Sequence, residues 1–293
     1  MGDGMTGTLL SIGHGYSAEA LARLLLPAGW RVIGTTRSAA RAQALAASGV
    51  EPRIWPGDDL GPDIAGASHV LTSVAPGPSG DPVLEALGES LAAARHLAWV
   101  GYLSTTGVYG DHGGGWVDEE TPLTPSTARG RARVAAEAGW QALAVRGGWP
   151  LVIFRLAGIY GPGRGPFEKI RNGTARRIIK EGQVFSRVHV EDIARAVAAS
   201  MERPGAGALF NLCDDEPAPP QDVLAHAADL VGLARPPEVP FHEADLSPMA
   251  ASFYAESKRV RNVRMKEDLG IAPRFPGYRE GLEAVLRAER AGK

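Results

Sequence analysis

The 293-residue sequence has a single cysteine, Cys213, and this scarcity excludes a framework of internal disulfide bonds. Because no cluster of cysteines and histidines is present either, we expect no structural zinc site, and a reducing cytoplasm fits. Long hydrophobic runs are missing as well. None approaches the roughly 18 residues of a membrane span, and the N-terminus lacks the pattern of a signal peptide, so we expect no membrane partner.

A strong charge of one sign is also missing. The formal net charge is −2, and the arginines are interleaved with Asp and Glu, which argues against a nucleic-acid partner. The first six residues, Met1-Gly2-Asp3-Gly4-Met5-Thr6, satisfy the loose pattern for N-myristoylation. We favour a flexible leader there, because so short a pattern recurs by chance.

Glycine, in contrast, is abundant, and its first informative use follows the first predicted strand, Thr8 to Ile12. The next residues form a Gly-x-Gly-x-x-Ala turn that opens an amphipathic helix, Ala18 to Leu26. The first glycine allows the tight turn, the second lets a pyrophosphate approach the backbone, and Ala18 permits close packing of helix on strand. We therefore predict that cofactor contacts come from Gly13, His14, Gly15, Tyr16 and Ser17. For His14 an ordinary loop position is the alternative.

The second predicted strand, Trp30 to Thr35, lacks the carboxylate that an NAD site places at its end for the ribose hydroxyls. The sequence there is Gly34-Thr35-Thr36-Arg37-Ser38, and Arg37 could pair bidentately with a 2′-phosphate. These residues predict NADP as the cofactor, with NAD as the second choice. The alternative for Arg37 is a solvated residue at the start of a helix.

Predicted strands and helices alternate through the first half of the chain, which is typical of a doubly wound parallel sheet. His69 to Ala75 is the fourth strand, Asp81 to Arg95 a helix, and Leu97 to Leu103 the fifth strand. Small hydroxyl residues then follow, before a helix over Pro125 to Gln141. Side chains at the carboxyl ends of such strands are placed where ligands bind, so the stretch from Ser104 to Gly110 is the centre of the predicted site.

Several motifs closely resemble the extended short-chain dehydrogenase/reductase family, the NAD(P)-dependent epimerases and dehydratases. They are Ser104-Thr105-Thr106-Gly107-Val108-Tyr109-Gly110, Tyr160-Gly161-Pro162-Gly163 and Val188-His189-Val190-Glu191-Asp192, and the C-terminal part is similar to the family's YeeZ-like members. The resemblance implies an α/β Rossmann domain over residues 1–163, with 184–213 returning to it, and a small substrate-binding lobe over 164–183 and 214–293. It places Thr105 at the catalytic Ser/Thr position, Asp58 beside the adenine and Ala75 in the strand end that leads under the cofactor.

One helix departs from the family pattern, which has a catalytic Tyr and a Lys four residues later. Aligned on Gly130 and Glu137, this chain has Arg129 and Arg133 in their places. A guanidinium has a pKa above about 12 and gives up no proton near neutral pH, so Arg129 cannot replace the tyrosine, whereas Arg133 could donate to ribose hydroxyls. As substitute acid we consider Tyr109, with its phenol pKa lowered by Arg133 or Arg129. The alternative is that Tyr109 packs near the substrate.

These observations predict an oxidoreductase or epimerase that binds NAD(P) and acts on a small carbonyl or sugar-like substrate. The alternative is a non-catalytic NADP(H)-binding sensor. A nucleotide-sugar substrate is in doubt, because Phe185 stands where such relatives have an Arg for the pyrophosphate. Family members often dimerise through the two helices predicted at 81–95 and 125–141, which implies a homodimer. Tyr254-Ala255-Glu256-Ser257-Lys258 has the catalytic spacing but the wrong place in the topology, so we predict lobe surface or packing there.

Overall fold

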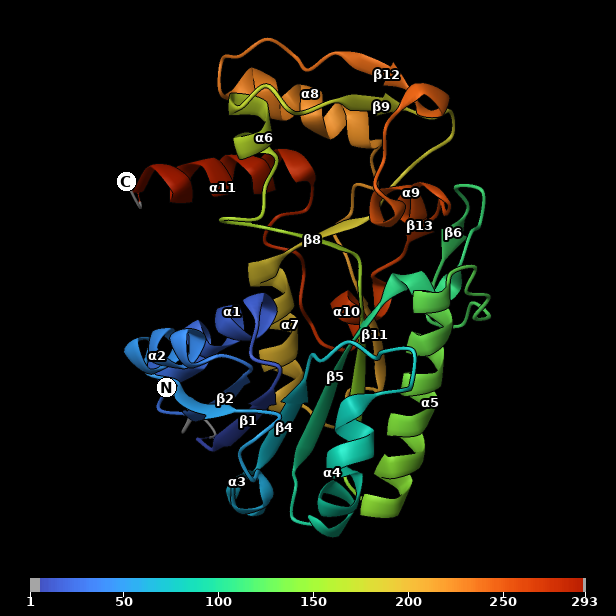
Figure 1. Ribbon diagram of the computed structural model, residues 1–293. Coiled ribbons are helices and arrows are strands. Elements are labelled where there is room, and N and C mark those ends of the chain that lie inside the picture. Colours follow the sequence, from blue (N-terminus) through green and yellow to red (C-terminus); the bar gives the residue numbers. More distant parts are fainter. Residues whose placement is uncertain (1–5, 292–293) are drawn as a thin grey trace.

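The computed structural model describes residues 6–291, so the predicted leader lies outside the described residues except for Thr6. Seven parallel strands form the central sheet, in the order β11-β7-β5-β4-β1-β2-β3 (Figure 1). The strands are β1 (Thr8–Ile12), β2 (Arg31–Thr36), β3 (Glu51–Ile54), β4 (His69–Thr72), β5 (Trp99–Thr105), β7 (Leu151–Leu156) and β11 (Leu209–Leu212). The chain winds outward from β1 in both directions, which confirms the predicted doubly wound fold.

Helices cover both faces of this sheet. One face carries α1 (Tyr16–Leu25), α2 (Ala39–Ala47) and α7 (Val190–Glu202), and the other carries α3 (Gly61–Gly66), α4 (Pro82–Ala93) and α5 (Ala128–Gly147). Alternate residues of a strand point to opposite faces. On β7, Val152 and Phe154 accordingly join the apolar cluster with α1 and α7, while Ile153 joins the one with α4 and α5. This burial on both sides explains the nearly continuous apolar runs in the sequence.

Helix α5 is longer than the sequence predicts and begins later. Thr127 caps it, because its Oγ1 accepts a hydrogen bond from Gly130 N at 3.0 Å. The helix runs past Gln141 because Trp140 and Leu143 pack into the core, and it ends where Gly148 adopts a φ of +69°. The first turn of α5 therefore faces the carboxyl end of β5, at the edge where a ligand would lie.

A smaller lobe stands above this edge of the sheet in Figure 1. Helices α6 (Phe167–Arg171), α8 (Pro220–Leu230) and α11 (Tyr278–Ala291) form a separate apolar cluster, which includes Phe167, Ala227, Leu282 and Tyr160. Two short parallel pairs belong to this region. The pair of β9 (Arg177–Ile179) and β12 (Glu238–Pro240) lies beside α8 at the far end of the lobe, and the pair of β8 (Gly158–Tyr160) and β10 (Arg187–His189) lies between the lobe and the sheet (Figure 1). The other smaller elements are η1 (Leu26–Ala28), η2 (Thr106–Tyr109), β6 (Trp116–Val117), η3 (Phe241–Glu243), α9 (Pro248–Tyr254), β13 (Arg259–Val260) and α10 (Val263–Glu267).

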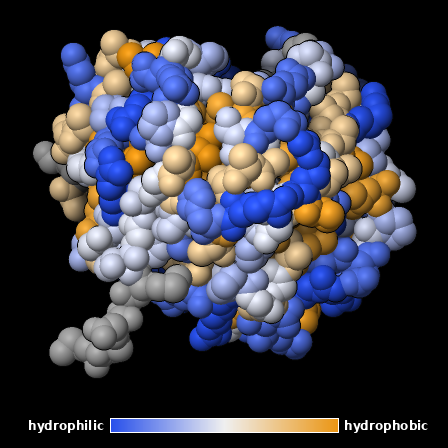
Figure 2. All heavy atoms as spheres, turned by 90° about the horizontal axis from the view of Figure 1, so that it is seen from below, coloured by the Kyte–Doolittle hydropathy of each residue, from blue (hydrophilic) through white to orange (hydrophobic). Residues whose placement is uncertain are grey.

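The glycine-rich loop at residues 113–115 is tied to the C-terminal segment. Gly114 N donates to Ser257 O at 2.8 Å, and β6 pairs in parallel with β13 just beyond it. The face of the molecule seen from below, away from the lobe, mixes hydrophilic and hydrophobic residues (Figure 2). Within residues 6–291, no helix is both long enough and apolar enough to cross a membrane.

Candidate functional site

The turn after β1 has the geometry that the sequence predicts for a dinucleotide site. Gly13 adopts a φ of +79°, and its N–H donates to Thr35 Oγ1 at 2.7 Å. A Cβ at this position would lie 2.7 Å from Val74 Cγ2, so a side chain is excluded both by the backbone and by its neighbour. Gly15 precedes α1 without a side-chain cap, which leaves the first backbone N–H groups of the helix for an anion.

His14 is the middle residue of this turn, between Gly13 and Gly15, and its side chain is buried. Its ring packs against the end of β2, where a Cβ on Gly34 would approach His14 Cγ to 2.8 Å. Burial, and to a lesser extent the Arg41 cation, lower the pKa of His14 to about 4, so the ring is neutral at physiological pH. Neither ring nitrogen has a hydrogen-bond partner among the described residues. Two unpaired buried nitrogens beside the turn fit a site that a polar cofactor completes.

Tyr16 links the cofactor turn to the lobe. Its Oη donates to Pro162 O at 2.9 Å, and a Cβ on Gly161 would collide with this hydroxyl. The phenol is therefore used to hold the Tyr160-Gly161-Pro162-Gly163 turn, and the backbone N–H of Tyr16 is what remains for a cofactor. Ser17 lies half-buried one residue further into α1.

Two other predicted contacts lie at the ends of β2 and β3. Arg37 is exposed, and its side chain has no ion pair or hydrogen bond among the described residues, so it is free to bind a ligand phosphate. Asp58 has a structural task, because its Oδ2 accepts from Ile54 N at 2.7 Å and closes the turn after β3. Its other oxygen remains available to an adenine.

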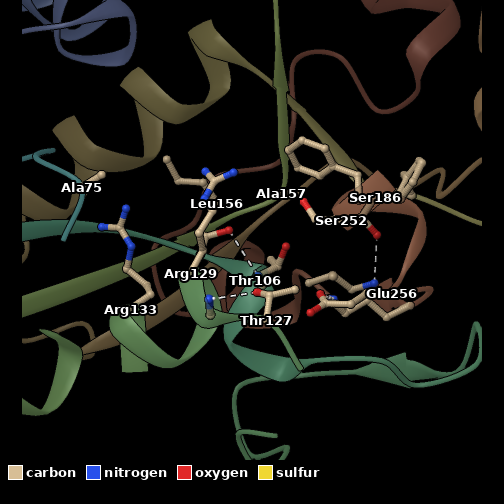
Figure 3. Close-up of a pocket in the computed structure, with 18 of the residues that line it drawn as sticks. Ala75, Thr106, Thr127, Arg129, Arg133, Leu156, Ala157, Ser186, Ser252 and Glu256 are labelled. Carbon is tan, nitrogen blue, oxygen red and sulfur yellow. Dashed lines mark hydrogen bonds and ion pairs between the residues drawn. The ribbon is translucent and has the colours of Figure 1, made fainter. Parts of the chain in front are cut away.

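A cavity of about 240 Å³ lies where β5 and β7 end beneath the lobe. It brings together Thr105, Arg133 and Ala75 from the predicted set, as well as Arg129. In Figure 3, Ala75 and Arg133 lie on one side of the cavity, Ser252 and Glu256 on the other, and Arg129 between them. Thr105 Oγ1 accepts from Gly107 N at 3.2 Å, which turns the chain into η2 and leaves the hydroxyl proton free to donate.

The two arginines of the degenerate helix differ in their contacts. Arg133 Nη1 donates to Tyr102 Oη at 2.7 Å and to Leu103 O at 3.0 Å, so the end of β5 fixes one nitrogen of the guanidinium. Its other nitrogens can still donate toward Ala75. Arg129 is exposed at the cavity and forms no ion pair or hydrogen bond through its guanidinium among the described residues.

Tyr109 does not reach the cavity, which argues against the predicted relay. It is fully buried, its Oη donates to Asn211 Oδ1 at 2.7 Å, and Arg155 Nη1 donates to it at 3.0 Å. The expectation of a lowered pKa is wrong, because burial outweighs Arg155 and raises the pKa of Tyr109 to about 12. Neither Arg129 nor Arg133 is among its hydrogen-bond partners.

Behind the cavity, Tyr109 belongs to a buried polar network. Arg155 and Glu137 form an ion pair at 2.8 Å, with side chains 5% and 3% exposed. Ser104 Oγ also donates to Glu137, so strands β5 and β7 and helix α5 are joined at this point. The network positions the strand end that carries Thr105.

Sequence reasoning missed the contribution of the C-terminal segment to the cavity. Glu256 and Lys258 both line it, although we predicted surface or packing for this stretch. Lys258 Nζ donates to Glu256 Oε2 and to Gly110 O, each at 2.6 Å, while Tyr254 at the end of α9 is not among the lining residues. The motif spacing gave no usable signal, because Ser257 and Lys258 follow α9 instead of continuing it. Among residues 6–291, no group of three or more His, Cys, Asp or Glu side chains is arranged to hold a metal ion.

Comparisons with known proteins agree with this geometry. Residues 83–213 match the NAD dependent epimerase/dehydratase family. Protein YeeZ of Escherichia coli (strain K12) is 31% identical over 240 residues, which cover 77% of this chain and 84% of YeeZ. The structure of a conserved protein of unknown function from Silicibacter pomeroyi is 61% identical, with a TM-score of 0.92 over 96% of this chain and 99% of that one.

More distant structures share the fold. UDP-glucuronic acid 4-epimerase from Bacillus cereus, in complex with NAD, is 18% identical and superposes with a TM-score of 0.79 over 97% of this chain and 99% of its own. The YeeZ likeness spans most of both chains and carries the assignment, to which the matched family segment adds. The protein belongs to the NAD dependent epimerase/dehydratase family of extended short-chain dehydrogenases/reductases, among its YeeZ-like members.

Proposed function

We propose that the protein is an NADP-dependent oxidoreductase that reduces a small carbonyl compound in the cavity at the ends of β5 and β7. The observation that carries this proposal is that one cavity collects Thr105, Arg133 and Ala75, at the same sheet edge as the Gly13 turn. The cavity is of modest volume, and Phe185 lies in its wall where sugar-nucleotide enzymes have an Arg. Both features favour a small carbonyl over a nucleotide sugar.

A bound nicotinamide would supply or accept the hydride. The turn at Gly13 to Ser17 would hold the pyrophosphate with backbone N–H groups, and the free nitrogens of Arg133 would donate to the nicotinamide ribose. Thr105 Oγ, whose proton is not used within the protein, would donate to the carbonyl oxygen and orient it. The hydride would go to the carbonyl carbon, and the proton for the resulting alkoxide would come from solvent water in the cavity. These residues could therefore support slow reduction without the family tyrosine.

NADP preference is proposed from Arg37, which is exposed and unpaired beside the end of β2. Parallel fluorescence titrations with NADPH and NADH test this. We expect tighter binding of NADPH and loss of most of that preference, about tenfold, in Arg37→Ala, because a charge-assisted bidentate contact is removed. Arg23→Ala, at an exposed arginine in the last turn of α1, is the matched control. Failure to bind either nucleotide would refute the proposal.

A second candidate function is a non-catalytic sensor of the NADP redox state. It is favoured by one specific observation: the described residues that line the cavity include no Tyr, His or Cys to act as a proton donor. A sensor must bind oxidised and reduced cofactor with different affinities. Equal affinities for NADP⁺ and NADPH would remove this candidate, and steady NADPH oxidation with an aldehyde would establish the enzyme.

We also propose a cytoplasmic homodimer that uses the outer faces of α4 and α5. Arg146 of α5 pairs with Glu89 of α4 at 2.8 Å on this exposed surface, and Val145 beside it is 85% exposed. A second copy packed on this surface would remove the exposed Val145 side chain from water. Light scattering after size exclusion should give twice the chain mass, and Val145→Asp should reduce it to the monomer value.

A further inference from the structure

We infer that the cavity takes a substrate that carries a carboxylate, and that Arg129 is its anchor. This inference rests on the proposed function, because it names the substrate class of the same cavity. Three cationic side chains line the cavity, Arg129, Arg133 and Lys258, against one anionic side chain, Glu256. A lining with this balance attracts an anion.

The three cationic groups differ in how many of their hydrogen-bond donors are already used within the protein. Lys258 is paired with Glu256 at 2.6 Å and also bonded to Gly110 O, and Arg133 is partly engaged by Tyr102 and Leu103. Of the three, only Arg129 has a guanidinium that forms no hydrogen bond or ion pair among the described residues, and its position between the two sides of the cavity is visible in Figure 3. The free guanidinium is thus the one that a ligand anion would meet first.

Among the described residues that line this cavity, no carboxylate is free to pair with Arg129. Glu256 is the only acidic residue among the described lining residues, and both of its oxygens are used: Oε1 accepts from Ser126 Oγ at 2.6 Å and Oε2 from Lys258 Nζ at 2.6 Å. An arginine held at a partly enclosed surface without a partner is best satisfied by a planar oxyanion, which its fork binds through two parallel hydrogen bonds.

Arg129 lies where a carboxylate bound to it would place the rest of the substrate next to Thr105. It stands where the family places the tyrosine that acts on the substrate oxygen, close to Thr105, and both residues line the same cavity. A guanidinium cannot supply a proton, but it can hold a carboxylate and so place a neighbouring carbonyl at the Thr105 hydroxyl. The substrate class is therefore a small carbonyl compound with a carboxylate, such as a 2-oxo acid.

The test compares benzoate with benzamide, a neutral molecule of the same shape, by ligand-observed NMR titration of the full chain. Titrations are run with and without saturating NADP⁺. We expect the wild type to bind benzoate at least about tenfold more tightly than benzamide. In Arg129→Gln this preference should disappear, and in Arg129→Lys it should be partly retained, because the charge remains while the fork is lost.

Arg131→Gln is the matched control. Arg131 lies two residues further along the same helix, is exposed, bonds Ser126 O at 3.0 Å and does not line the cavity, so its removal should leave the benzoate preference unchanged. Phenylphosphonate is added to distinguish a phosphoryl ligand from a carboxylate. Circular dichroism confirms that each variant is folded.

The outcomes separate this inference from the proposed function. Equal affinity for benzoate and benzamide, a benzoate preference that survives Arg129→Gln, a tenfold preference for phenylphosphonate, or no binding of any probe would each overturn the carboxylate anchor. None of these results changes the outcome of the NADPH titration, which tests the proposed function separately. If NADPH fails to bind, the proposed function fails, and the measurement made without cofactor still decides whether Arg129 holds a carboxylate.

Discussion

The turn after β1 and the first turn of α5 lie at the same edge of the sheet, yet only the turn after β1 follows the family pattern throughout. In the β1 turn the requirement is steric, because Gly13 has a φ of +79° and a neighbour 2.7 Å from any added Cβ. The α5 turn keeps its steric element too, since a Cβ on Gly130 would lie 2.9 Å from Gly107 O. Its two chemical positions, Arg129 and Arg133, do not follow the pattern. The fold constrains shape strictly and leaves the chemistry of exposed cavity side chains open to change.

The largest effect should come from the buried support that α5 shares with the strands. Glu137→Gln leaves the Arg155 guanidinium without its charged partner in a site where both side chains are at most 5% exposed. We expect a loss of about 3–5 kcal/mol in the free energy of unfolding, measured by urea denaturation. Glu89→Gln, which breaks an exposed ion pair of α4 and α5, should cost less than about 1 kcal/mol. Similar losses in both variants would contradict the assigned role of the network.

Restoring the family pair tests whether α5 still presents its first turn correctly. The double variant Arg129→Tyr, Arg133→Lys introduces a phenol that can transfer a proton and a lysine that can hold it in its ionised form. We expect NADPH-dependent reduction of 4-nitrobenzaldehyde to rise by on the order of 100-fold over the wild type. Arg131→Tyr, outside the cavity, should not change the rate.

An unchanged rate in a double variant that still folds and binds NADPH would show that the helix no longer directs residue 129 at the reacting centre. In that case the first turn of α5 would depart from the family pattern in its backbone position as well as in its side chains, unlike the β1 turn.

The β1 turn should be intolerant of even the smallest side chain. Gly13→Ala forces a non-glycine residue into the left-handed region and brings its Cβ against Val74. We expect a loss of about 1–3 kcal/mol in stability and at least tenfold weaker NADPH binding. Gly66→Ala is the control, because it lies in α3 with no atom within 4 Å of an added Cβ. Equal NADPH affinity in Gly13→Ala and the wild type would remove the turn from the cofactor site.

The contrast also explains which parts could be predicted from the sequence. Local rules predicted the doubly wound parallel sheet and the Gly13 turn, because short motifs and burial patterns determine them. The family resemblance predicted Thr105 and Arg133 at one edge. The burial of Tyr109 depends on η2, which turns its side chain toward Asn211, 102 residues away. Lys258 meets Gly110 across 148 residues. Contacts at such separations depend on how a distant strand of the sheet and the C-terminal segment pack against this edge, which no local pattern encodes.

The placement of Tyr109 predicts a small effect where the sequence suggested a large one. Tyr109→Phe removes the hydrogen bonds to Asn211 and Arg155 but leaves the cavity lining unchanged. We expect a loss of about 1–3 kcal/mol in stability, since buried polar partners become unpaired, and less than about threefold change in the rate of carbonyl reduction. Thermal unfolding and NADPH oxidation would be followed side by side. A large loss of turnover in a Tyr109→Phe variant that stays folded would show that Tyr109 takes part in carbonyl reduction.

The smallest effect concerns pH and His14 in the β1 turn. Burial first and Arg41 second lower the pKa of His14 from 6.5 to about 4, so the ring stays neutral from pH 8 down to 5.5. With an ordinary histidine pKa, protonation in that window would add a cation beside the pyrophosphate and tighten binding as the pH fell. We therefore expect the dissociation constant of NADH, free of the titrating 2′-phosphate, to change by less than about threefold between pH 8 and 5.5, as it should in His14→Asn. A marked tightening in the wild type that is absent from His14→Asn would mean that the ring titrates in solution and is less enclosed than its packing against Gly34 indicates.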